Sequence, residues 1–105
     1  MTQSDDRPTG FEADLSRNEE MMFRVLARRN RLLGEWAAGL MGLSEAEAEA
    51  YSKDLVRADF EGGGGKDVVL KLLGDLTGAG VEIDESRIRD ALKDKLVDAR
   101  RQLIG

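Results

Sequence analysis

The side chains of this sequence that could do chemistry are arginines, carboxylates and a single tryptophan, because the chain contains neither histidine nor cysteine. Histidine is the usual general base and metal ligand, and cysteine supplies thiol nucleophiles, thiolate metal sites and disulfides. No carboxylates are spaced so that they would converge from different elements as an acid and a base. The sequence therefore predicts no catalytic residue, no metal site and no required cofactor, and we expect the chain not to be an enzyme.

A glycine run at residues 62–65, followed by Lys66, superficially resembles a phosphate-binding loop. Such a loop needs another glycine five residues before the last one, a Ser or Thr after the lysine, and a preceding strand. Here Phe60 and Asp67 occupy those two positions, and the run follows a predicted helix. We interpret it as a flexible link between helices.

The most informative polar side chains lie in residues 27–42, ARRNRLLGEWAAGLMG. With about 100° of turn per residue, Arg29 falls at one edge of an apolar helical stripe and Asn30 falls just beyond the other edge. Arg24, Arg28 and Arg31 fall on the far face, where charge is ordinary. The stripe itself is made of Leu15, Met22, Leu26, Leu33, Ala37 and Leu40.

Arg29 and Asn30 are thus predicted to be semi-buried between helices, where each needs a hydrogen-bond partner. Two interpretations remain open. The pair is either a structural device that fixes helix register, or part of a site for an anionic ligand or a partner chain.

Helical periodicity extends over four segments, at about residues 12–40, 45–60, 67–76 and 84–103. Ser44 and Glu47 form a capping box before the second segment, and Gly34 predicts close approach of another helix to the first. The fold class is therefore all-α: a small four-helix bundle over residues 19–105 with a disordered N-terminal arm over residues 1–18. The inner faces of the last three helices are predicted to carry Tyr51, Leu55 and Ala58; Val68, Val69, Leu72, Leu73 and Leu76; and Ile88, Leu92, Leu96, Ala99 and Leu103.

Composition bounds the partners of the chain. Its 105 residues are enough for one domain, and a net charge of −5 argues against a nucleic-acid binder. The sequence has no apolar run of about 20 residues that would insert in a membrane, and its start, MTQSDDRPTG, lacks the pattern of a signal peptide. We expect a cytoplasmic protein that is monomeric when free.

Two blocks of the sequence resemble the zeta subunit of alpha-proteobacterial F-type ATP synthases, a family of small inhibitor proteins. ARRNRLLGEWAAGLMGLS, at residues 27–44, resembles the family's ARRNKLLGLWAA followed by a G-L-[ST] helix break. AYSKDLVRADFE, at residues 50–61, is similar to the family's AYAKEVVKADFE. Residues 5–7 match its DDR and residues 11–13 match its F-E-A or F-E-T.

The resemblance implies a regulatory subunit that binds the alpha, beta and gamma subunits of the catalytic head and blocks ATP hydrolysis. In this family the N-terminal segment inserts at a catalytic alpha/beta interface close to gamma and becomes helical there. The protein would then be peripheral to the inner membrane, held there through the synthase. The residues implied in partner binding are Asp5, Asp6, Arg7, Phe11, Glu12 and Leu15, with Phe11 as the hydrophobic anchor.

The family is also associated with purine-nucleotide binding by the helical body, which implies a regulatory ADP or ATP. Arginine suits phosphate and an indole face suits a base. The residues that would line such a site are Arg28, Arg29, Asn30 and Trp36.

The arm departs from its relatives at Pro8 and Gly10, both of which oppose helix formation. A bound helix is therefore expected to begin beside Pro8. The alternative function is a non-inhibitory helical adaptor, or a nucleotide-sensing protein, that docks on the synthase or on another partner.

Overall fold

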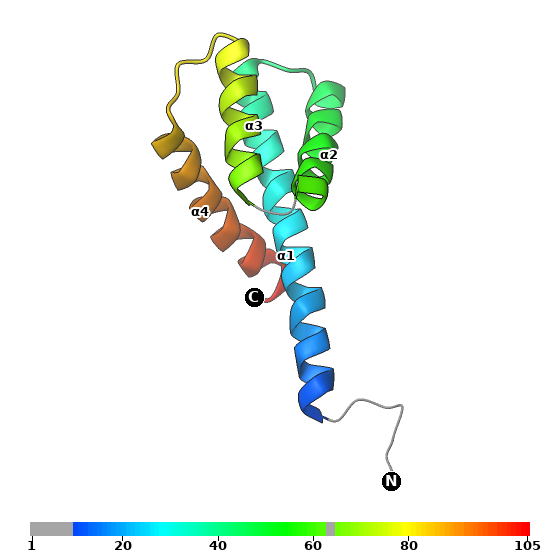
Figure 1. The fold of residues 1–105 in the computed structure, drawn as a ribbon. Coiled ribbons are helices and arrows are strands. Elements are labelled where there is room, and N and C mark those ends of the chain that lie inside the picture. The colour runs from blue at the N-terminus through cyan, green and yellow to red at the C-terminus, as the bar shows by residue number, and fades with distance from the viewer. Residues whose placement is uncertain (1–9, 63–64) are drawn as a thin grey trace.

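The computed structural model describes the backbone of residues 10–62 and 65–105, and the side chains of residues 18–62 and 67–105. The described chain forms four helices, α1 (Gly10–Met41), α2 (Glu45–Gly62), α3 (Gly65–Gly78) and α4 (Glu85–Leu103), and no strand. Helices α2 and α4 lie on either side of α1, and α3 lies across the face between them (Figure 1). The all-α, four-helix fold class is confirmed.

The N-terminal turns of α1 extend past the ends of the other three helices (Figure 1). The backbone is helical from Gly10, slightly earlier than the predicted start near residue 12. The part of the predicted arm at residues 1–9 lies outside the described residues. Residues 10–18, which we assigned to the arm, thus share one unbroken helix of 32 residues with the body.

Local sequence signals end α1 and begin α2 and α4 close to the predicted bounds, whereas α3 begins at Gly65, two residues before its predicted start. The Ser44 Oγ accepts from the Glu47 backbone N–H at 3.2 Å, and the Glu47 Oε1 accepts from the Ser44 N–H at 2.8 Å, so the capping box is confirmed. Gly42 adopts a φ of +73°, the left-handed conformation that stops α1. The Asp84 carboxylate caps α4 by accepting from the Arg87 N–H at 2.9 Å.

The hydrophobic core lies where α1, α2, α3 and α4 meet. Val81 and Ile83, in the link before α4, pack against this core as half-buried residues. Residues from the predicted inner faces of α3 and α4 make up most of the buried core cluster. The buried core cluster consists of Leu33, Ala37, Leu55, Val68, Val69, Leu72, Leu76, Ile88 and Ala91.

Two predicted core positions of α1 are wrong. Met22 is 48% exposed and Leu40 is 45% exposed, although both share the helical face of the fully buried Leu33. Met22 precedes Val25, the first buried residue of α1 among those described, and Leu40 lies in the last turn of the helix, while Leu33 lies between them in the packed stretch. Val25 and Ala38 are buried outside the predicted stripe, because α1 packs against both α2 and α4 and its buried face is wider than one stripe.

The contact between α1 and α2 is closest at Gly34, as the sequence predicted. A Cβ atom on Gly34 would lie 2.6 Å from the Cα of Ser52, which no real packing allows. Ser52 is itself fully buried, and its hydroxyl donates to the Ala48 carbonyl at 2.9 Å. The missing side chain at Gly34 is what lets the two backbones approach.

A polar cluster joins α2 to α3. The Tyr51 hydroxyl donates to Asp75 Oδ2 at 2.7 Å, and Lys71 Nζ lies 3.1 Å from the same oxygen and over the tyrosine ring. Burial, and then the hydrogen bond to Asp75, raise the pKa of Tyr51 well above its ordinary value. The neutral phenol is therefore a structural link between these helices.

No helix in the described part of the chain is long and apolar enough to cross a membrane.

Candidate functional site

Arg29 and Asn30 lie in the contact between α1 and α2, where they are 8% and 1% exposed. The guanidinium of Arg29 donates through Nε and Nη2 to Asn30 Oδ1, at 3.1 and 3.0 Å. Asn30 Nδ2 in turn donates to Asp59 Oδ2 at 2.7 Å, and Arg29 Nη2 lies 3.6 Å from the same oxygen. The predicted burial of both residues is confirmed, and Asp59 of α2 is the partner that they need.

The electrostatics of this triad are those of a buried ion pair. Burial lowers the pKa of Arg29, and the nearby Asp59 carboxylate acts in the opposite direction. The guanidinium of an arginine stays protonated in proteins, so Arg29 keeps its positive charge beside the Asp59 carboxylate. Asp59 Oδ1 is buried and has no hydrogen-bond partner within the described part of the chain. Because Asn30 links Arg29 to Asp59 across the contact between the two helices, these residues fit a device that fixes the register of α1 against α2.

Sequence reasoning did not single out Asp59. The signal that could have found it is its position one helical turn after the buried Leu55, which places a carboxylate on the inner face of α2. A buried arginine and asparagine on one helix call for such an acceptor on the facing one.

The other two residues of the predicted nucleotide set face α4. Arg28 Nη1 donates to Gln102 Oε1 at 3.2 Å. Trp36, two turns farther along α1, packs beneath the guanidinium of Arg87, whose carbon lies 5.3 Å from the ring centroid. The structure brings Arg29 and Asn30 together, but it directs Arg28 and Trp36 to separate contacts with α4.

The predicted partner-binding residues lie at the N-terminus. Asp5, Asp6 and Arg7 are outside the described residues. Phe11 and Glu12 belong to the first helical turns of α1, and Leu15 follows in the same helix. The backbone at these three positions is thus helical, which is the conformation the resemblance implies for the segment when it is bound.

A shallow groove of about 380 Å³ runs along the face of α1 between α2 and α4, and sequence reasoning did not single it out. Three of its side chains are arginines at helical spacing, and the others are apolar. We call it the arginine groove. It is lined by Phe23, Arg24, Ala27, Arg28 and Arg31 of α1, Val56 of α2 and Leu103 of α4.

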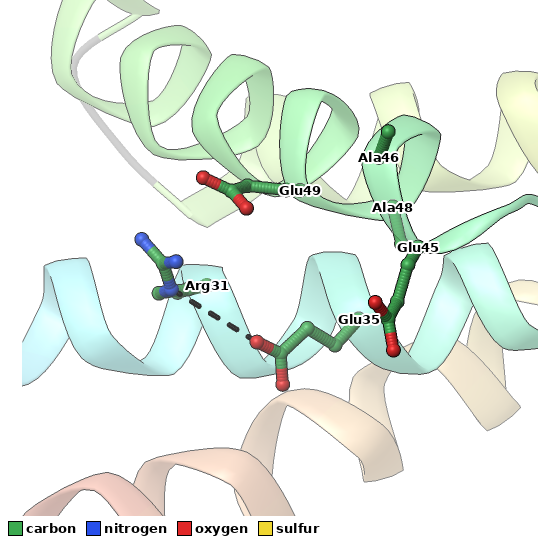
Figure 2. Close-up of a pocket in the computed structure, with 6 residues that line it drawn as sticks. All are labelled: Arg31, Glu35, Glu45, Ala46, Ala48 and Glu49. Atoms are coloured by element: carbon green, nitrogen blue, oxygen red, sulfur yellow. Dashed lines mark ion pairs between the residues drawn. The ribbon is translucent and has the colours of Figure 1, made fainter.

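A second, acidic hollow of about 500 Å³ lies farther along α1, beside the start of α2 (Figure 2). Arg31 belongs to both hollows and pairs loosely with Glu35, with its Nε 3.9 Å from Oε2. Glu45 and Glu49 come from the first turns of α2, where negative charge is favoured by the helix dipole. Among the described residues no group of three or more carboxylates is arranged to hold a metal ion.

Comparisons with known proteins agree with this architecture. A solved solution NMR structure shares 41% sequence identity with this chain and superposes with a TM-score of 0.69. The superposition covers 80% of this chain and 95% of that one. No curated protein sequence gave a match. The profile of one protein family, described as ATPase inhibitor subunit zeta, matches residues 1–102. Because that match covers essentially the whole sequence, the chain belongs to the ATPase inhibitor subunit zeta family.

Proposed function

We propose that this chain is the inhibitory subunit of an F-type ATP synthase, which binds the catalytic head and blocks ATP hydrolysis through its N-terminal segment. The observation that carries the proposal is the family match over residues 1–102, whose description is that of an ATPase inhibitor. The same description supports a regulatory protein rather than an enzyme.

The shape of α1 supports the part assigned to the N-terminal segment. Its first turns extend beyond the other helices, so a partner can surround residues 10–18 without displacing the body (Figure 1). Phe11 and Leu15 are one helical turn apart, a spacing that lets two apolar side chains enter one cleft.

The partner surfaces that we propose are the alpha and beta subunits at a catalytic interface, together with gamma. A segment wedged there opposes rotation in the direction of hydrolysis. The protein would be monomeric when free and peripheral to the membrane when bound. Regulation by ADP or ATP stays a prediction, and titration of the free protein with each nucleotide tests it.

The test is ATP hydrolysis by the isolated catalytic head, titrated with the full chain and with a version that lacks residues 1–18. We expect the full chain to inhibit hydrolysis and the shortened chain not to inhibit, while far-UV circular dichroism shows that the body is still helical. Binding of the full chain without inhibition would favour the adaptor alternative. Failure of the full chain to bind the head would overturn the proposal.

A further inference from the structure

We propose that the arginine groove is a second docking surface, and that its occupant is an acidic, amphipathic segment of the same catalytic head. This inference rests on the proposed function and deepens it, because it assigns to the helical body a contact separate from the N-terminal segment.

The charge in the groove is opposite to that of the whole protein. Arg24, Arg28 and Arg31 line one face of α1, in a chain whose net charge is −5. Arg24 pairs with Glu20 at 3.2 Å and Arg31 pairs with Glu35 at 3.9 Å, and all four side chains are about half exposed or more. Exposed pairs of this kind contribute little to stability, so carboxylates of a partner can replace them at little cost.

The apolar part of the groove leaves aromatic surface in water. Phe23 is 53% exposed and Phe60, in the last turns of α2, is 69% exposed. The two rings meet edge to face with their centroids 5.2 Å apart, and Phe23 lines the groove. Phenylalanine and arginine are both enriched at protein interfaces relative to the rest of the surface. A small anion would neutralise the arginines but leave these rings in water, so the groove fits a segment that is both acidic and apolar.

The geometry of α1 connects this groove to the proposed inhibitory contact. The helix is unbroken from Gly10 to Met41, and at 1.5 Å per residue Arg24 lies about 20 Å from Gly10. A partner that holds the first turns of α1 therefore brings its own surface to a fixed distance from the groove. The two contacts then belong to one continuous interface with one partner.

The length of the acidic stretch in the partner is also limited. Arg24 and Arg31 are about 10 Å apart along the helix axis, which is two helical turns. Beyond Arg31 lies the acidic hollow, with Glu35, Glu45 and Glu49 in its wall (Figure 2). Carboxylates that continued past Arg31 would meet like charge, so we expect the matching acidic residues within about two turns of the partner.

The experiment compares two charge-reversal variants of the full chain. The groove variant is Arg24→Glu with Arg31→Glu, which spares Arg28 because that side chain holds Gln102 of α4. The control variant is Lys53→Glu with Arg89→Glu, which makes the same change in net charge. Lys53 and Arg89 are exposed residues that pair with Glu49 and Glu85 within their own helices.

Affinity for the isolated catalytic head is measured for each variant over a range of salt concentrations. We expect the groove variant to bind at least tenfold more weakly at low salt, with a shallower salt dependence, and the control to bind within about twofold of the unmodified chain. A further variant, Phe60→Ser, is expected to bind several-fold more weakly with an unchanged salt dependence. Thermal unfolding of each variant verifies that the body is intact.

Equal affinity of the groove variant and the control, with inhibition by the unmodified chain preserved, would overturn this inference and leave the proposed function standing. Failure of the unmodified chain to bind the catalytic head would overturn both this inference and the proposed function. If the free protein binds ADP, and the groove variant alone loses this binding while its affinity for the head is unchanged, the groove would be reassigned to a nucleotide. A dimer of the unmodified chain that the groove variant dissociates, again with head binding unchanged, would reassign it to a second copy.

Discussion

The Cα of Ser52 lies 2.6 Å from the point where Gly34 would carry a Cβ. This single approach sets how closely α2 packs on α1, and the triad of Arg29, Asn30 and Asp59 lies in the same contact. The separation of α1 and α2 therefore also sets the distance between Asn30 and Asp59, which share a hydrogen bond across this contact.

Replacement of Gly34 by alanine is expected to destabilise the fold. The added methyl meets backbone, so α1 and α2 must separate, at a cost of about 1–3 kcal/mol that exceeds the helix propensity gained. Thermal unfolding should show a midpoint lower by about 4–8 °C for each kcal/mol lost in a domain of this size. Gly39→Ala in the same helix is the matched control, because nothing lies within 4 Å of its Cβ position. A midpoint for Gly34→Ala as high as that of the control would refute the close contact.

Arg29→Ala is expected to destabilise the body by about 2–3 kcal/mol, because it leaves Asp59 as a buried carboxylate with one partner fewer. Arg24→Ala removes only an exposed pair with Glu20 and should change the stability by less than about 0.5 kcal/mol. Chemical denaturation of the two variants measures the difference directly. Equal midpoints would show that the triad contributes nothing to the fold.

Stability should fall at alkaline pH because of Tyr51. Its pKa is raised in the folded state, so the stabilisation is complete below the pKa of an unfolded tyrosine, about 10, and is lost as the pH rises above that value. Tyr51 is the one tyrosine of the chain, so tyrosinate absorbance follows it without interference. We expect this absorbance to appear together with unfolding, and the alkaline loss of stability to be smaller in Tyr51→Phe. Ordinary titration near pH 10 in a folded protein would contradict the link to Asp75.

Phe11→Ala is expected to weaken inhibition of ATP hydrolysis at least tenfold. An apolar anchor that fills a cleft in a partner typically contributes about 2–4 kcal/mol to binding. The stability of the free body should not change, which circular dichroism and thermal unfolding verify. Thr9→Ala, two residues away, serves as the control for a change in the same segment. Unchanged inhibition by Phe11→Ala would place the anchor elsewhere.

Much of the fold could be predicted from local signals. The capping box at Ser44 and the close contact at Gly34 each act within one turn or one contact, so the sequence pattern identifies them directly. Burial of Arg29 and Asn30 also followed from their positions beside an apolar stripe. These features depend on helical periodicity, which the sequence contains.

The remaining features depend on how far each neighbouring helix extends, which periodicity does not contain. Met22 and Leu40 have the right angular position for burial, but Met22 precedes the buried stretch of α1 and Leu40 lies in the last turn of the helix. Asp59 matters only because α2 faces Asn30. The arginines at 24, 28 and 31 look like ordinary surface charge until α2 and α4 form walls on either side of them. The partner-binding residues rest on the resemblance alone, because the structure does not describe their side chains.

The unbroken helix that joins the N-terminal turns to the body also acts as a lever. A stiff rod converts a small change in the angle of the body into a displacement of its far end. Over the roughly 20 Å between Arg24 and Gly10, a tilt of about 10° moves the tip by some 3–4 Å, about the width of one side-chain contact. The seating of the body on its partner would then set how deeply the tip reaches, and a substitution far from the tip could change inhibition through angle alone.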